Sequence, residues 1–272
     1  MNYLKTAISA VFLLFSAFGQ ARAQNSAAAK KSIIHTRVVL LTYKHNDSSL
    51  LEDHVDTLSL PVPSGNYPEL KKALSFRNIA DADGEAAVKK NYAECSCGIT
   101  GLSYEVTFES KDFLSIKIFT EGMGAYPSSS WQWLTLNVHT GKPYAIGNEI
   151  NPAGLKWIYN SYKVLLLQRI ASDRKANPAP AGESQDDYNS IYDEQKQSVN
   201  SLAMNELLKN FVFTAKGITF TTAGVLPHAT QALEIDREWL IPYNKAVKYK
   251  AANARVVNKW THATISPPQR AQ

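Results

Sequence analysis

The two cysteines of the chain, Cys95 and Cys97, lie within the short segment 94–98. In an oxidising compartment they would close a small local disulfide, and the alternative is a pair of free thiols. A soft-metal site would need further Cys or His ligands nearby in the sequence, and none stands there. We therefore expect a local structural disulfide rather than a reactive or metal-binding pair. Closing so short a loop adds little stability.

Two tryptophans, Trp131 and Trp133, are candidates for a recognition surface. They stand two apart in a segment that alternates like a strand, so both face the same way, opposite Leu134 and Leu136. Two indole rings on one face can form a platform for a sugar or a protein partner. The alternative, which we favour, is burial under the helix expected over 153–171, since tryptophan is usually mostly buried.

An acidic row is expected on a later strand, where Glu234, Asp236 and Glu238 alternate with apolar residues. Such a row can engage a basic protein or a cation, so the three carboxylates are candidates for ligand binding. A solvated strand face is the simpler interpretation, because Arg237 supplies local counter-charge.

Catalytic groups are harder to find. The six histidines are scattered, and the chain has no Gly-x-Ser-x-Gly nucleophile elbow. Glu121 and Glu149 are the candidates if the chain is a hydrolase that uses carboxylates as acid and base. We favour a chain without enzymatic activity and expect neither a metal nor a cofactor.

Residues 1–23 have the pattern of an export signal. Lys5 gives a positive start, 7–18 is apolar, and Ala21 and Ala23 are the small residues that a signal peptidase requires. The apolar run is shorter than the roughly 20 residues of a membrane-spanning helix, and Arg22 ends it, which disfavours a retained anchor. We expect cleavage after Ala23 and a mature chain in the periplasm or outside the cell.

The charge of the chain is mild. Loss of Lys5 and Arg22 with the signal lowers the net charge from +5 to +3, and the remaining charges are interspersed. Nothing resembles the clustered basic face of a nucleic-acid-binding protein. About 250 residues remain, enough for one large domain or two small ones, with no transmembrane segment expected after signal cleavage.

Hydrophobic periodicity predicts an α+β fold in which an antiparallel β-meander packs with helices. A Gly-rich loop is expected over 121–130, and 58–63 is expected to be an edge segment because prolines end it. Strands are expected over 33–43, 58–63, 102–108, 112–119, 131–139, 211–213, 218–220 and 231–240. Helices are expected over 66–79, 84–93, 153–171, 188–208 and 242–252.

A change of composition divides the mature chain. Residues 173–187 are rich in Pro, Ala, Gly and acid, which is typical of a linker. It separates an N-terminal α+β half with the meander, 24–172, from a C-terminal helix–hairpin–strand half, 188–252, and the two halves are expected to form one mixed unit. Residues 253–272 are expected to be a disordered tail.

Five short segments then follow in a recognisable order: DFLSI from Asp112, GAYP from Gly124, LNVHTGK from Leu136, FTAKGITF from Phe213 and IPY from Ile241. Over most of residues 55–250 this order resembles the extracytoplasmic domain family of RsiV-type anti-sigma factors. The same family is found N-terminal in some peptidoglycan deacetylases and in stand-alone exported bacterial proteins. The resemblance implies a mixed α+β unit.

The resemblance also implies a kind of partner, because in RsiV-type members this domain is a receptor that binds lysozyme. The family loop usually reads Gly-Gly-Ala-His, whereas here it reads Met123-Gly124-Ala125-Tyr126. The missing histidine removes the best titratable group from the loop. We expect Gly124 to serve a backbone conformation that glycine adopts easily, and a ligand-binding loop of Gly124, Ala125 and Tyr126 is the alternative.

These expectations favour an exported, non-enzymatic binding protein of the bacterial cell envelope. Its partner would be a cell-wall glycan or an envelope or extracellular protein such as lysozyme, with no nucleic-acid partner. The alternatives are a hydrolase or accessory domain that acts on peptidoglycan or another glycan, and a structural envelope protein.

Overall fold

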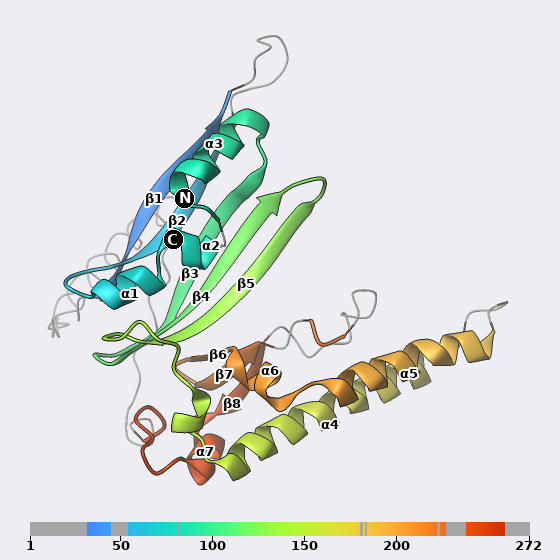
Figure 1. Ribbon diagram of the computed structural model, residues 1–272. Helices are drawn as coiled ribbons and strands as arrows, with labels where there is room; N and C mark the ends of the chain where they lie inside the picture. The colour runs from blue at the N-terminus through green and yellow to red at the C-terminus, as the bar shows by residue number, and fades with distance from the viewer. Residues whose placement is uncertain are drawn as a thin grey trace, which may run out of the picture. The chain divides into compact units, whose positions relative to one another are not determined.

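A computed structural model describes residues 32–44, 54–80, 82–179, 182, 184–221, 224–226 and 238–258. In these ranges the chain forms one five-stranded sheet, one three-stranded sheet and several helices, which confirms the expected α+β class (Figure 1). None of the described helices is both long enough and apolar enough to cross a membrane.

The first sheet has the order β1-β2-β3-β4-β5. Its strands are β1 (Ile34–Tyr43), β2 (His54–Pro63), β3 (Gly98–Glu109), β4 (Phe113–Met123) and β5 (Pro127–Asn137). Strands β3, β4 and β5 are the expected antiparallel meander, whereas β2 runs parallel to β3, with Leu58 beside Leu102.

The prediction that 58–63 lies at an edge is wrong, since β2 lies between β1 and β3. Pro61 and Pro63 pair with Thr36 and Ile34 of β1, while the pairing with β3 is at Leu58, short of both prolines. A proline cannot donate a ladder hydrogen bond, so an inner strand tolerates it where the neighbouring ladder has ended.

Three helices cover one face of this sheet (Figure 1): α1 (Pro68–Ala73), α2 (Phe76–Ala80) and α3 (Glu85–Cys95). Leu70, Val88 and Tyr92 from these helices join Ile116 and Ile118 of β4 in one buried apolar cluster. The helix expected over 66–79 is broken at Leu74–Ser75 into α1 and α2, and α1 begins with Pro68 at its first turn.

A tight turn after β5 fixes the position of α1. Gly141 has a φ of 63°, and a Cβ there would collide with the backbone of Glu69 and Leu70. Only glycine meets both requirements without strain.

The second sheet has the order β6-β7-β8, with β6 (Phe211–Phe213), β7 (Gly217–Thr221) and β8 (Glu238–Pro242). Its flanking elements are η1 (Ile146–Asn148), α4 (Pro152–Ala176), α5 (Gln185–Ser201), α6 (Met204–Lys209), α7 (Tyr243–Ala246) and η3 (Val247–Tyr249). Two apolar clusters pack around this sheet and the long helices, one of them between α4 and α5.

Several boundaries differ from those expected. Helix α4 runs on to Ala176 and α5 starts at Gln185, so both helices take residues from the expected linker. The helix expected over 188–208 is interrupted between α5 and α6 at Leu202–Ala203. The first part of the expected tail is packed rather than disordered, since Val256 and Val257 are buried. The rest of that tail, the signal and most of the strand expected over 231–240 lie outside the described residues.

Candidate functional site

The end of the β4–β5 hairpin holds four of the eight candidate ligand-binding residues, Gly124, Ala125, Tyr126 and Trp131 (Figure 1). We use "hairpin end" for the last part of β4 (119–123), the turn 124–126 and the first part of β5 (127–131). The expected loop over 121–130 is therefore mostly strand, because β4 and β5 stay paired as far as Met123 and Pro127.

The turn presents the expected loop residues to solvent. Tyr126 is 82% exposed and Met123 is 40% exposed. The expectation that Gly124 needs a conformation special to glycine is wrong, since its φ is not positive and a Cβ there would meet nothing within 4 Å. The alternative, a ligand-binding loop of Gly124, Ala125 and Tyr126, stays a prediction.

The two tryptophans share one face of β5, as the alternation predicted, but only one is accessible. Trp131 is 46% exposed and lies beside Phe119, with ring centroids 4.7 Å apart. Trp133 is only 5% exposed. A platform of two indoles does not form, although Trp131 and Phe119 together offer a smaller aromatic surface.

Trp133 is buried, and Lys117 of β4 lies over its ring. The Nζ of Lys117 lies 4.5 Å from its ring centroid, and the same Nζ is 2.5 Å from Oε1 of Glu238 on β8. The side chain of Lys117 is 7% exposed, so a cation–π contact and an ion pair hold an otherwise costly buried cation. No local pattern predicts this contact, because Lys117 and Glu238 are 121 residues apart in the chain.

The acidic row is only partly described. Glu238 is engaged with Lys117, so it is a structural partner of β4 and not an open acidic site. Glu234 and Asp236 lie outside the described residues.

A cavity of about 580 Å³ lies between α3 and the hairpin end. Thr120, Ser128 and Ser130 line it from the strands, and Ala87 and Asn91 line it from α3. The registers Thr120 with Ser130 and Gly122 with Ser128 place these hydroxyls on the face that carries Ile116 and Ile118, which α1–α3 cover. Trp131 and Phe119 lie on the opposite face, so the hairpin end presents two separate surfaces.

The two candidate catalytic carboxylates, Glu121 and Glu149, differ in burial and in their partners. Glu149 is fully buried, and its oxygens accept the backbone N–H groups of Arg255, Val256 and Val257 and the hydroxyl of Tyr144. All of these donors come from the fold itself, so this carboxylate stabilises the structure. Glu121 is exposed, and its carboxylate lies over Gly101, where a Cβ would collide with it.

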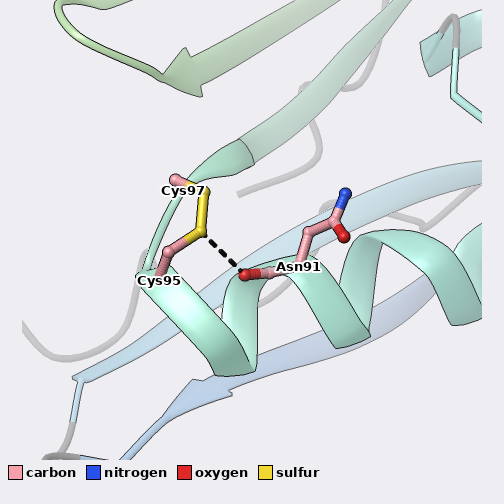
Figure 2. The surroundings of a disulfide bond; sticks show 3 residues. All are labelled: Asn91, Cys95 and Cys97. Atoms are coloured by element: carbon pink, nitrogen blue, oxygen red, sulfur yellow. Dashed lines mark hydrogen bonds between the residues drawn. A yellow bond between two sulfur atoms is a disulfide. The ribbon is translucent and has the colours of Figure 1, made fainter.

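Cys95 and Cys97 form a disulfide at the C-terminal end of α3, directly before β3 (Figure 2). Ser96 between them is left-handed, with a φ of 50°, and Sγ of Cys95 lies 3.1 Å from the carbonyl oxygen of Asn91. The negative end of a helix and the neighbouring Glu94 both disfavour a thiolate. The position therefore suits a staple between α3 and β3 better than thiol chemistry. Within the described residues, no group of three His, Cys, Asp or Glu is placed to hold a metal ion.

Comparisons with known proteins give a likeness of fold. No family model matches the chain, and no curated protein matches it in sequence. The structure is similar to that of a DUF3298 family protein from Pseudomonas aeruginosa PAO1, with a TM-score of 0.53 and 9% identity over 87% of this chain and 97% of that one. The fold is that of DUF3298 proteins.

A DUF3298 family member from Bacteroides fragilis NCTC 9343 is also similar, at 15% identity over 85% of this chain and 97% of that one, with a TM-score of 0.49. The Pseudomonas aeruginosa protein belongs to DUF3298, a domain family related to the RsiV-type domain, and its likeness to this chain is one of fold.

Proposed function

We propose that the chain is an exported, non-enzymatic binding protein of the bacterial cell envelope, which recognises a cell-wall component or a wall-active protein such as lysozyme. The observation that carries the proposal is the hairpin end, which exposes Met123, Tyr126 and Trp131, the last of these beside the partly buried ring of Phe119. Exposed tryptophan and tyrosine side chains supply large contact areas at a low entropic cost, which is why they dominate the energetics of many interfaces.

Two independent features support export. The signal pattern of residues 1–23 predicts a mature chain that begins at Gln24. The Cys95–Cys97 disulfide suits an oxidising compartment, because the cytosol keeps most thiols reduced. N-terminal sequencing of the protein recovered outside the cytoplasm tests this part directly, and an intact Met1 end would contradict it.

The carboxylates favour binding over hydrolysis. Glu149 is occupied by the fold, with four hydrogen-bond donors on its two oxygens. It is therefore not available as one of the two facing carboxylates that glycoside hydrolysis uses, which leaves Glu121 as the remaining one of the two candidates. The RsiV-type resemblance supports the same choice, since in those members the domain is a receptor.

The test is a titration of the exported protein against c-type lysozyme and against purified peptidoglycan. Trp131→Ala and Tyr126→Ala are expected to weaken binding of the true partner by at least about tenfold, the usual effect of removing an interface anchor. The control is Ile191→Ala on α5, which removes a side chain of similar exposure, 44%, away from the hairpin end.

Unchanged binding in both hairpin variants would show that another surface is used. Release of labelled fragments from peptidoglycan by the native protein would overturn the non-enzymatic assignment, because a binding protein gives no turnover.

A further inference from the structure

We infer that the cavity between α3 and the hairpin end binds a neutral saccharide rich in hydroxyl and amide groups. This inference rests on the proposed function and adds to it a second site and a class of ligand. The cavity has about 580 Å³, within the range of small-molecule sites, about 300–1,000 Å³.

The uncharged polar side chains that line the cavity carry hydroxyl or amide groups. Thr120, Ser128 and Ser130 contribute three hydroxyls from two paired strands, and Asn91 contributes a side-chain amide from α3. Hydroxyl and amide groups both donate and accept hydrogen bonds. The hydroxyls of a sugar ring also donate and accept hydrogen bonds. A sugar hydroxyl can therefore bond to these side chains either as a donor or as an acceptor.

The charge of the cavity disfavours anionic ligands. Among the described residues that line it there is no Lys, Arg or His, and the charged ones are Asp83 and Glu121. A phosphate or a carboxylate needs positive partners or a ring of free N–H donors to offset its desolvation. The two carboxylates can accept hydrogen bonds from the hydroxyls of an uncharged sugar.

The remaining wall is small and apolar. Ala80, Ala87 and Val88 lie opposite the hydroxyls, on the side of α2 and α3. Small side chains here are what keep the space open, and they offer the C–H face of a sugar a surface to pack on. The disulfide of Figure 2 fixes this geometry, because Asn91 in α3 and Gly98 at the start of β3 both line the cavity on either side of the linked cysteines.

The experiment fills the cavity and then removes one hydroxyl. Ala87 and Ala86 are neighbours in α3, but only Ala87 lines the cavity, while Ala86 is exposed. We expect Ala87→Phe to weaken binding of an N-acetylglucosamine oligomer by at least about tenfold, and Ala86→Phe to leave it unchanged. Thr120→Val is expected to weaken binding as well, with Thr57→Val on β2, an exposed threonine of a strand, as its matched control.

The same titration includes the deacetylated, cationic oligomer and inorganic phosphate, and circular dichroism confirms that each variant is folded. Preferred binding of the cationic oligomer or of phosphate would overturn the neutral class. Oligomer binding that Ala87→Phe does not affect would overturn the site.

If the native protein ignores every oligomer yet binds lysozyme or peptidoglycan through Trp131, this inference is wrong and the proposed function stands. If it binds none of them, both are wrong.

Discussion

A single buried carboxylate holds the last described segment of the chain in place. Glu149 accepts three backbone N–H groups at 2.9 Å from residues 255–257 and the hydroxyl of Tyr144 at 2.7 Å. Burial and this carboxylate raise the pKa of Tyr144 above its ordinary range. Glu149, a catalytic candidate from the sequence, therefore has a structural role. Its three backbone N–H donors explain why residues 255–257 are packed instead of disordered.

Replacing the carboxylate of Glu149 by an amide tests whether it stabilises residues 255–257. Glu149→Gln puts an NH₂ group where an acceptor stood, so at least one buried N–H loses its partner. We expect the free energy of unfolding to fall by about 2–3 kcal/mol, measured by urea denaturation. Glu194→Gln, at an exposed position of α5, is the control and should change it by less than about 0.5 kcal/mol. A loss as small as the control's would show that Glu149 does not hold this segment.

Ionisation of Tyr92 is expected to lower the stability of the folded protein at alkaline pH. Its side chain is buried on α3 and donates to Oδ2 of Asp56 at 2.7 Å, and burial followed by this bond raises the pKa of Tyr92 to about 12. In the unfolded chain the pKa of this hydroxyl is the ordinary tyrosine value of 10.0, so the unfolded chain releases the proton at a lower pH than the folded chain does. The stabilisation is thus complete below pH 10 and is lost as the pH rises towards 12.

Urea midpoints measured between about pH 9 and about pH 11 should therefore fall, and fall less steeply in Tyr92→Phe, which has no proton to release. Tyr126→Phe, at the exposed turn, is the control and should keep the native slope. Equal slopes in all three proteins would refute the contribution of Tyr92.

At the scale of elements, β8 is joined to β4 by an ion pair whose two ends differ in exposure. The side chain of Lys117 is 7% exposed and that of Glu238 is 53% exposed. Removing either partner leaves the other alone, but only Glu238 can be rehydrated where it stands. The cost of breaking the pair should therefore depend on which partner is removed.

We expect Glu238→Ala to lower the free energy of unfolding by about 3 kcal/mol, because it leaves the buried ammonium group of Lys117 without its ion-pair partner. Lys117→Met keeps the packing on Trp133 and removes the buried charge, so it should cost less than about 1.5 kcal/mol. Thermal and urea denaturation of both variants measure the difference. A larger loss in Lys117→Met than in Glu238→Ala would contradict the asymmetry.

At the scale of the whole molecule, a buried chain of hydrogen bonds links the two sheets. Thr135 on β5 donates to the carbonyl of Phe211, Ser115 on β4 lies 2.9 Å from the hydroxyl of Thr135, and Ser115 accepts the N–H of Phe213. These bonds satisfy edge groups of β6 with side chains of the first sheet. From Ile33 onward the chain forms one compact unit, and these contacts account for part of that unity.

One cooperative unfolding transition is expected for this unit, seen alike by tryptophan fluorescence and by far-ultraviolet circular dichroism. Thr135→Val leaves the carbonyl of Phe211 without its donor and should lower both midpoints together, by about 1–3 kcal/mol in free energy of unfolding. Thr57→Val, exposed on β2, should lower neither. Two separate transitions in the native protein would show that the sheets fold independently.

The fold class and the meander follow from local patterns in the amino-acid sequence. Leu114, Ile116 and Ile118 alternate with polar residues over a length that only a strand explains, and side-chain alternation is a local property of the backbone. The same argument placed Trp131 and Trp133 on one face correctly. It also suggested the helices, although it misplaced their ends at Leu74 and Leu202, where the periodicity continues across a break.

Which of these residues are accessible and which have a structural role depends on contacts made in the folded protein. Trp133 and Trp131 have the same local pattern, yet Trp133 is buried, with Lys117 over its ring, and Trp131 is exposed. Glu149 has a structural role because it accepts N–H groups from the last described segment. Thr120, Ser128 and Ser130 line a cavity together with residues of α3. Burial and hydrogen-bond partners depend on residues distant in the chain, and no local pattern records them.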